Sequence, residues 1–428
     1  MSTQVVQSIK VDTLIIGAGV IGSSVAMHLA ELSSKQGGEA HSGEIRCVDF
    51  DLEGGLSSSE LNAGGVRATW NQPINIRMAQ HTIDYFAENA EAVGYHACGY
   101  LWLQTPEKLP ASLKARERQI AMGWPVEAWD LSELKRRIPF IDKTDDLAGA
   151  VFGSRDGLVN PNRVKNHFRE KARAKGARFD DRTLVRSAEY QADGSLRVIC
   201  ERYPAAMDTD QKIEALSDRP VPGVPVERIE YHAQRVVNCA GPWAKPIAKI
   251  LGYDSPVYSQ RRQICIFDCR DVDLTKYGMM IDTSGVYFHP EATNGLAGWA
   301  NHDEPHGVNY SYDGESFFME HIWPALYERS TAFEKLKHVT GWAGLYEVSP
   351  DESAIIGAVE TGDPARAGAR GRVFEAHSFS GHGVMHSHSA GLAVAELMLQ
   401  GKYSNMDVSE LSAARFALGR EVRETAII

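Results

Sequence analysis

The sequence lacks an excess of positive charge. It has 45 Lys and Arg residues against 56 Asp and Glu, which gives a formal net charge of −11 at pH 7. Chains that bind the phosphate backbone of nucleic acids, or an anionic membrane surface, through general electrostatics carry a basic surplus instead. We therefore expect no nucleic-acid partner.

Cysteine is also scarce. The 428 residues include 6 cysteines, with no Cys-x-x-Cys pair and no dense spacing of the kind found in disulfide frameworks. Thinly spread cysteines are typical of proteins that work in a reducing compartment. The sequence thus predicts a cytoplasmic protein.

No segment combines the features of a membrane span or an export signal. Residues 13–30 carry no charge, but they contain three glycines, two serines and a histidine, and Asp12 and Glu31 flank them. No basic segment precedes them and no small-x-small cleavage site follows. We expect this segment to belong to a soluble fold, with no membrane span.

No internal repeat is visible either, and the 43% hydrophobic residues suffice for a sizeable core. A continuous apolar strand at residues 11–16 is followed by a helical pattern at 20–32, a loop at 33–44 and a short strand at 45–48. Such an apolar run suits a strand buried on both faces of a parallel sheet. These segments predict one βαβ unit.

The remaining segments mix helical spacing with alternation typical of strands. We expect helices at residues 75–92, 110–122, 131–137, 162–175 and 387–400, strands at 196–200 and 229–237, an exposed loop at 203–225 and a second sheet at 263–299. This order favours a nucleotide-binding α/β domain interleaved with a mostly antiparallel sheet domain.

A Gly-x-Gly-x-x-Gly motif connects the first strand to the first helix. Gly17 permits the tight turn, Gly19 lets a pyrophosphate approach the backbone at Val20 and Ile21, and Gly22 allows close packing of helix and strand. An acid at the end of the next strand accepts hydrogen bonds from ribose hydroxyls. The candidates are Asp49, followed by Phe50, and its rival Asp51. The motif predicts a bound dinucleotide but leaves its identity open.

A loop of small and hydroxylated residues follows the ribose acid. It suits a backbone that passes a pyrophosphate and a flat ring system, and its candidate cofactor contacts are Ser58, Ser59, Asn62, Ala63, Gly64 and Gly65. Beside a flavin ring, Arg67 is a natural partner for a substrate carboxylate, although a surface charge is the alternative interpretation.

Four motifs together resemble one family. GAGVIGSS, SSSELNAGGVR, VVNCAGPWA at residues 236–244 and FSGHGVM at 379–385 are similar, in order and spacing, to the D-amino acid oxidase-like flavoproteins. Glycine oxidase, sarcosine oxidase and dimethylglycine dehydrogenase belong to this family. The resemblance covers residues 10–400, and it implies a Rossmann-type FAD-binding domain (residues 1–75, 155–255 and 340–428) interleaved with a mostly antiparallel β-sheet substrate domain flanked by helices (76–154 and 256–339).

The resemblance also implies which residues meet the cofactor. The VVNCAGPWA segment corresponds to the adenine side of FAD, and the FSGHGVM segment to the flavin pyrimidine. The matching residues of this chain are Cys239, Ala240, Gly241, Trp243, Gly381, His382, Gly383, Val384 and Met385. Backbone amides and a helix N-terminus at the second segment would stabilise the negative charge of reduced flavin.

Departures from the family pattern qualify these expectations. Family members that tether the flavin use a cysteine or a histidine, and this chain has Gly344 and Asn62 at the matching positions. We therefore expect noncovalent FAD. Met385 replaces a lysine that helps to hold a substrate carboxylate, and residues 293–300 lack the lysine that activates oxygen in sarcosine oxidase.

Among the remaining candidates, His382 and His386 stand at the i, i+4 spacing that can hold a metal, but no carboxylate accompanies them, so we expect no metal. Trp70 and Tyr287 are interpreted as core residues, and Tyr346, by family position, as facing the ring. The candidate catalytic residues are Arg67, Tyr346 and His382.

The leading hypothesis is an FAD-dependent oxidoreductase that oxidises the C–N bond of an amino acid or secondary amine by hydride transfer to flavin N5, with hydrolysis of the imine product. The alternatives are an FAD-dependent 2-hydroxy acid dehydrogenase or oxidase, a flavin-bearing subunit of a larger dehydrogenase complex, and an NAD-dependent dehydrogenase without flavin. Substrate, electron acceptor and oligomeric state stay open.

Overall fold

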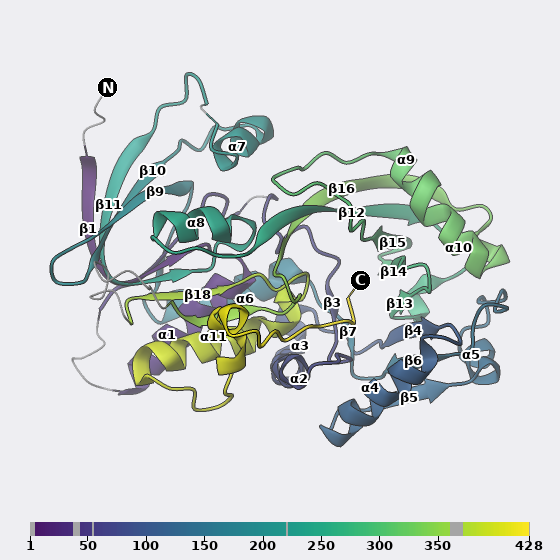
Figure 1. The fold of residues 1–428 in the computed structure, drawn as a ribbon. Helices are drawn as coiled ribbons and strands as arrows, with labels where there is room; N and C mark the ends of the chain where they lie inside the picture. Colours follow the sequence, from purple (N-terminus) through teal and green to yellow (C-terminus); the bar gives the residue numbers. More distant parts are fainter. Residues whose placement is uncertain (1–4, 37–42, 54, 220, 360–370, 428) are drawn as a thin grey trace.

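The computed structural model describes residues 5–36, 43–53, 55–219, 221–359 and 371–427. Two large sheets lie side by side in Figure 1, and the chain passes between them several times. A third, two-stranded sheet joins β3 (Gly65–Val66) to β7 (Gly157–Leu158). Within these ranges no helix is both long enough and apolar enough to cross a membrane.

The first sheet has the strand order β17-β18-β11-β1-β2-β8, and β10 and β9 extend it from β11. The neighbours from β18 to β8 are parallel, whereas β17, β10 and β9 pair antiparallel. Its strands are β1 (Val5–Ile16), β2 (Ile45–Val48), β8 (Arg178–Asp180), β9 (Thr183–Tyr190), β10 (Leu196–Arg202), β11 (Glu227–Asn238), β17 (Ile355–Ala358) and β18 (Val373–His377).

Strand β1 is buried on both faces, as its apolar run predicts. Leu14 and Ile15 are each fully buried, but they belong to different hydrophobic clusters because neighbouring side chains point to opposite faces. The cluster that holds Ile15 lies under four helices, α1 (Val20–Gln36), α2 (Pro73–Glu88), α6 (Pro161–Ala174) and α11 (Gly383–Gln400). Helix α1 packs against both α6 and α11.

The second sheet has the order β16-β12-β15-β14-β13-β4-β6-β5 and is antiparallel except between β13 and β4. Its strands are β4 (Tyr100–Gln104), β5 (Val126–Trp129), β6 (Gly149–Gly153), β12 (Tyr258–Asp268), β13 (Met279–Ile281), β14 (Tyr287–Glu291), β15 (Asn294–Trp299) and β16 (Lys337–Val348). The predicted combination of an α/β layer with a mostly antiparallel sheet is confirmed.

Shorter helices surround these sheets. Near the second sheet, in the right half of Figure 1, lie α4 (Leu109–Ala121), α5 (Leu131–Arg137), α9 (Glu315–Phe317) and α10 (Trp323–Arg329). The others are α3 (Ala90–Val93), α7 (Thr209–Leu216), α8 (Ala244–Ile250) and α12 (Ala414–Ala417).

Most predicted elements exist, with shifted ends. The loop predicted at 33–44 starts later because α1 continues to Gln36, and residues 37–42 of that prediction lie outside the described ranges. The helix predicted at 75–92 is divided at Asn89 into α2 and α3. Strand β16 crosses the predicted domain boundary at residue 340 and pairs with β12 throughout; the division into domains stays a prediction.

The exposed loop predicted at 203–225 is wrong in part, because it contains α7. The carboxylate of Asp208 accepts a hydrogen bond from the backbone N–H of Gln211, whose side chain in turn accepts from the N–H of Asp208. This reciprocal capping box satisfies two N–H groups that a helix start leaves without partners. The Asp-x-x-Gln spacing was the local signal that would have predicted the helix.

Candidate cofactor and substrate site

The glycine turn between β1 and α1 is too crowded for side chains. Gly17 has a φ of +94°, and a Cβ there would lie 2.3 Å from the carbonyl oxygen of Cys239. A Cβ on Gly19 would lie 2.9 Å from Ser59 Oγ, and one on Gly22 would lie 1.9 Å from the oxygen of Gly17. Gly22 therefore serves the packing of α1, while the first two glycines keep the turn open to a ligand.

Asp49 stands at the end of β2 and faces this turn. Its carboxylate accepts hydrogen bonds from the backbone N–H of Ala18 at 2.5 Å and from that of Asp51 at 2.9 Å. The carboxylate of Asp51 has another partner, since Lys212 Nζ lies 2.8 Å from it. This arrangement supports Asp49 as the ribose acid, a role that stays a prediction.

A cavity of about 880 Å³ extends from Asp49 past the glycine turn to the start of α11. This volume is in the range of cofactor-sized ligands. Sixteen of the predicted cofactor residues line it: Gly17, Gly19, Val20, Ile21, Asp49, Phe50, Ser58, Ser59, Asn62, Cys239, Ala240, Gly241, Trp243, Gly381, Gly383 and Val384.

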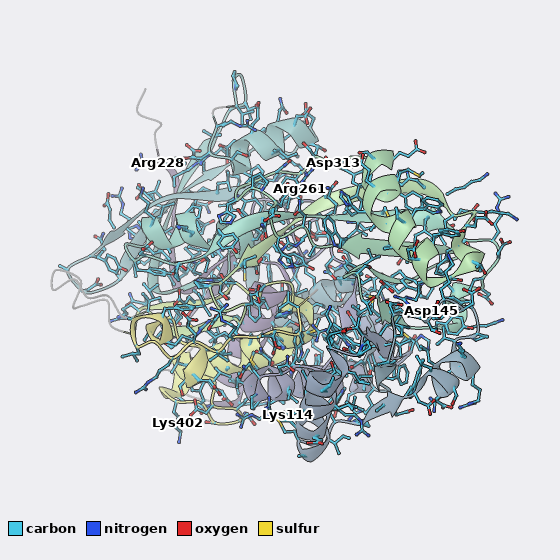
Figure 2. The ribbon with its side chains drawn as sticks, turned by 45° about the vertical axis from the view of Figure 1, so that its right-hand side comes forward. Lys114, Asp145, Arg228, Arg261, Asp313 and Lys402 are labelled. Atoms are coloured by element: carbon cyan, nitrogen blue, oxygen red, sulfur yellow. The ribbon has the colours of Figure 1, made fainter. Side chains whose placement is uncertain are left out.

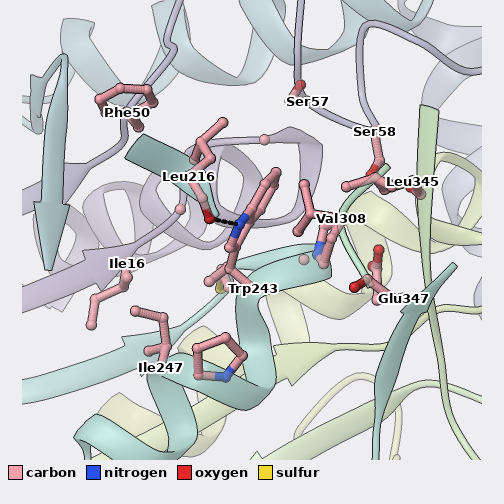
Figure 3. A pocket seen from close by; sticks show the side chains of 18 of the residues that line it. Ile16, Phe50, Ser57, Ser58, Leu216, Trp243, Ile247, Val308, Leu345 and Glu347 are labelled. Carbon is pink, nitrogen blue, oxygen red and sulfur yellow. Dashed lines mark hydrogen bonds between the residues drawn. The ribbon is translucent and has the colours of Figure 1, made fainter. Parts of the chain in front are cut away.

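Helix α7, which the sequence did not predict, covers part of this cavity. Trp243 Nε1 donates a hydrogen bond to the carbonyl oxygen of Leu216 at 2.8 Å, the contact drawn as a dashed line in Figure 3. Leu216, Ser217 and Asp218 line the cavity. The Lys212–Asp51 ion pair fixes the same helix to the ribose end, so α7 and the loop after β2 hold one another in place.

A second missed element is the loop after β15. Arg261 on β12 binds Glu304 at 2.6 Å and Asp313 at 2.8 Å, and Figure 2 shows Arg261 and Asp313 next to each other. These ion pairs hold the loop that brings His306 to the cavity, where its ring stacks on Tyr258 at a centroid distance of 3.7 Å. No local motif marks this loop in the sequence.

A smaller chamber of about 60 Å³ adjoins the cofactor cavity, and the two share Asn62, Tyr346, Gly381 and Val384. It is lined further by the predicted residues Ala63, Gly64, Gly65, Arg67, His382 and Met385, and by Trp70, Tyr100, Met279, Tyr287 and Ser380. The core interpretation of Trp70 and Tyr287 is therefore incomplete, because both rings also form walls of this chamber. The chamber adjoins the end of the large cavity at the start of α11.

Arg67 is a buried cation without a carboxylate partner among the described residues. Its side chain is 2% exposed and donates hydrogen bonds to the carbonyl oxygens of Thr69 and Ala426. Its guanidinium lies 3.4 Å from the ring centroid of Trp70 and 4.7 Å from that of Trp102. Burial lowers its pKa, but a guanidinium stays charged in proteins, so the chamber has a fixed positive charge.

Residues 420–427 contact the start of α2 and the guanidinium of Arg67. The buried carboxylate of Glu424 accepts hydrogen bonds from the backbone N–H groups of Asn71 and Gln72, just before α2, and from the Asn75 side chain at 3.1 Å. Two residues later, Ala426 supplies its carbonyl to Arg67. This segment follows the last family motif, and no sequence pattern connects it with the site.

Two buried histidines, His382 in the chamber wall and His386 on α11, are neutral at ordinary pH. Burial holds the pKa of His382 well below its usual range and lowers that of His386 to about 3, and the positive charge of Arg67 acts in the same direction. Their rings contact Trp70, at centroid distances of 4.0 and 5.7 Å respectively. The i, i+4 pair thus belongs to an aromatic cluster.

Tyr346 lines both cavities, as expected from its position on β16, and burial raises its pKa. Arg262 lies 5.1 Å from the Tyr346 ring centroid, but its guanidinium donates to the carbonyls of Arg261 and Asn301 and lines neither cavity. Arg67 is therefore the better candidate for a substrate carboxylate.

These features define a dinucleotide-dependent oxidoreductase: a turn without side chains at a helix N-terminus, an acid at the next strand end, and a small charged chamber at the far end of the cavity. Residues 12–397 match the family described as FAD dependent oxidoreductase (DAO), and the chain belongs to this family. Its cofactor is accordingly FAD, and the crowded glycine turn and the long cavity fit that cofactor.

Individual relatives agree with this assignment. The chain is 28% identical to FAD-dependent oxidoreductase domain-containing protein 1 of Xenopus laevis, over 95% of this chain and 83% of that protein. It is 24% identical to the mitochondrial dimethylglycine dehydrogenase of Homo sapiens, over 95% of this chain but 44% of the enzyme. The fold is shared with L-proline dehydrogenase from P. horikoshii, with a TM-score of 0.76, 22% identity and coverage of 96% and 99% of the two chains.

Proposed function

We propose that this protein oxidises the C–N bond of a small amino acid or secondary amine. The observation that carries the proposal is the buried, unpaired guanidinium of Arg67 in a chamber that adjoins the cofactor cavity. Among the described residues no carboxylate forms an ion pair with Arg67, although Glu424 and Asp156 lie near enough to act on its charge. Such a buried cation favours an anionic ligand, and a guanidinium binds a carboxylate through two parallel hydrogen bonds. Two relatives, by their names, act on dimethylglycine and L-proline, which are amines with a carboxylate.

The residues of the chamber bind and orient the substrate. Arg67 would hold the carboxylate, while the rings of Tyr346, Tyr287 and Tyr100 exclude water and limit the space around the α-carbon. FAD, when bound, supplies the hydride acceptor. The imine product would then be hydrolysed in water.

The neutral histidines favour an amine over a 2-hydroxy acid. Oxidation of a hydroxyl group needs a base for the hydroxyl proton, and a histidine whose pKa lies well below its usual range is a weak base at neutral pH. An amine that enters this chamber loses its proton to water, because burial and the positive charge of Arg67 disfavour the ammonium form. His382 therefore shapes the chamber and needs no proton-transfer role.

The test is an anaerobic substrate screen that follows bleaching of the flavin absorption band. N-methyl amino acids, cyclic and acyclic amino acids and the matching 2-hydroxy acids are compared at equal concentration, and no assumption about the acceptor is needed. The proposal expects bleaching by at least one carboxylated amine and none by its hydroxy analogue. Bleaching by hydroxy acids alone would replace the proposal by the hydroxy acid alternative.

The cofactor is proposed to be noncovalent. A Cβ on Gly344 would lie 3.0 Å from Leu61 Cβ, which leaves little room for a tethering cysteine. Asn62 uses its side chain to bond the backbone of Ser59 and Gly64. Acid precipitation of the yellow protein should release all flavin into the supernatant, and yellow colour in the pellet would contradict the proposal.

The electron acceptor is proposed to be a carrier rather than oxygen. The segment of β15 that corresponds to the oxygen-activating lysine of sarcosine oxidase contains no lysine. We expect faster turnover with an artificial dye than with oxygen. Activity of the isolated chain with the dye would also separate an independent enzyme from a subunit that needs a larger complex.

We propose a cytoplasmic location, and the oligomeric state stays open. The thinly spread cysteines support a cytoplasmic site of action, and all six are free thiols in the described structure. Cell fractionation and the mass of the purified protein in solution test location and oligomeric state.

A further inference from the structure

One carboxyl group faces the cofactor cavity without a known purpose. Glu347 lies on β16 next to Tyr346 and lines the large cavity, where Figure 3 shows its carboxylate near Val308. A Cβ on Gly241 would lie 3.7 Å from Glu347 Oε2. On its other side, the backbone N–H of Phe379 points to the same carboxyl group.

These neighbours fix the position of Glu347 along the cofactor. Gly241 follows Cys239 and Ala240, which pack against Gly17 in the pyrophosphate turn. Phe379 begins the segment that leads to the flavin end at α11. Glu347 would therefore face the stretch of FAD between its adenine half and its flavin ring, which includes a chain of hydroxyl groups.

The carboxyl group of Glu347 has no ionic partner. Among the described residues, no side chain makes an ion pair or a hydrogen bond with it. Several titratable or charged groups lie on the elements packed around Glu347 or line the same part of the cavity. They are Tyr346 on β16, Tyr258 and Arg262 on β12, His306 on the loop after β15, His382 before α11 and Lys245 on α8. Burial raises the pKa of Tyr346, and Glu347 acts in the same direction.

We propose that Glu347 binds the hydroxyl chain of FAD in its protonated form, so that the affinity for FAD falls as the pH rises above neutrality. A protonated carboxyl can donate a hydrogen bond to a hydroxyl oxygen and accept one in return. An ionised carboxylate would instead face the pyrophosphate across a cavity from which the cofactor excludes water. This inference concerns the cofactor alone and holds whichever substrate is oxidised.

Burial supports the same conclusion. Partial burial in the cavity wall raises the pKa of the Glu347 carboxyl to about 7, because this position disfavours the charged form. The FAD phosphates would raise that pKa further. Above pH 7, FAD binding then requires uptake of a proton, and the dissociation constant rises up to about tenfold for each pH unit. Below pH 6 the group is protonated with and without FAD, and the pH dependence disappears.

The experiment measures FAD release on dilution of the holoprotein, by the fluorescence of free flavin, at several pH values. The wild-type dissociation constant should be about thirtyfold higher at pH 8.5 than at pH 6. Glu347→Gln cannot ionise and keeps a hydrogen-bond donor. Its dissociation constant should stay within about twofold over this range and equal the wild-type value at pH 6.

A matched control is Asp84→Asn. Asp84 lines neither cavity, and its side chain is 55% exposed and pairs with Arg155. This variant should keep the wild-type pH dependence. The proposal is overturned if the wild-type affinity is constant between pH 6 and 8.5, if it increases with pH, or if Glu347→Gln retains the wild-type slope. The wild-type measurement decides the first two outcomes even if the variant does not fold.

Discussion

The cofactor cavity and the chamber beside it are built in opposite ways. The cavity has a volume of about 880 Å³, and backbone and small residues of the glycine turn form much of its wall at the pyrophosphate end. The chamber has about 60 Å³, and aromatic rings, a methionine pair and one guanidinium enclose it. The cavity offers main-chain groups to a long ligand, whereas the chamber offers side chains to a small one.

This difference separates recognition through the backbone, which many sequences can provide, from recognition through particular side chains. Main-chain recognition needs glycines at fixed spacing and tolerates variation elsewhere, because N–H groups at a helix N-terminus are the same in every sequence. Side-chain recognition changes with each substitution. The predictions below test this division, first by damaging the backbone of the cavity and then by changing single side chains.

The largest effect is expected from Gly17→Ala. At a φ of +94°, with Cys239 O 2.3 Å from the added Cβ, the turn cannot keep its shape. The purified variant should contain no flavin, as measured by the ratio of flavin to protein absorbance. Gly55→Ala is the control, since a Cβ there meets nothing within 4 Å, and it should be fully yellow. A yellow Gly17→Ala protein would show that the turn does not bind the cofactor.

A smaller effect within the cavity should come from Asp49→Ala. Loss of a charge-assisted acceptor costs about 1.5 to 3 kcal/mol, or roughly ten- to a hundredfold in FAD affinity. Asp51→Ala should weaken FAD less, because that carboxylate binds Lys212. Fluorescence titration of both variants gives the order, and the reverse order would assign the ribose to Asp51.

The glycine turn and Asp49 were predictable because their signal is contiguous: an apolar strand, three spaced glycines and an acid after the next strand. Helix α7 carried a local capping signal at Asp208 and Gln211 that the abundance of Asp, Pro and Gly nearby obscured. Its place over the cofactor cavity depends on the contacts of Lys212 and Trp243 with distant segments, which no local pattern records.

The chamber could be predicted only in part. Arg67, Tyr346 and His382 lie in or next to family motifs, so the resemblance placed them near the flavin. Tyr100, Met279 and Ala426 come from separate segments with no motif. They meet only because the second sheet pairs β13 with β4 and because Glu424 fixes the segment 420–427 to the start of α2.

Acid should lower the free energy of unfolding by protonating the buried His386 when the chain unfolds. The folded-state pKa of His386 is about 3, below the unfolded value of 6.5, so the unfolded chain binds more protons between these values. Stability is complete above pH 6.5 and falls as the pH decreases. Between pH 7.5 and pH 5 this histidine should remove about 2 kcal/mol from the free energy of unfolding.

In His386→Leu, the loss of unfolding free energy between pH 7.5 and pH 5 should be about 2 kcal/mol smaller than in the wild type. Urea unfolding at these two pH values measures it. The remaining buried histidines keep their share of the pH dependence. Parallel curves for the variant and the wild type would mean that His386 is not held in the neutral form.

The smallest effect is expected from Lys212→Ala. The Lys212 side chain is 27% exposed, so its ion pair with Asp51 contributes about 0.5 to 1 kcal/mol. Release of α7 should speed FAD dissociation about two- to fivefold, measured as the rise of flavin fluorescence after dilution. Lys276→Ala, which removes an exposed pair with Asp273 that does not line the cavity, should leave the rate unchanged. Equal rates for both variants would contradict a covering role for α7.

The most direct test of the account compares two ligands under anaerobic conditions: the best amino acid of the substrate screen and the amine that lacks only its carboxylate. Loss of the interaction with Arg67 should cost about 2 to 3 kcal/mol of binding free energy. The wild-type protein should therefore need a concentration of the amine at least about thirtyfold higher than that of the amino acid for the same bleaching of its flavin. In Arg67→Met, with FAD still bound, this preference should fall to within about threefold. A preference that survives in Arg67→Met, or equal bleaching of the wild type by both ligands, would contradict the assignment of the chamber.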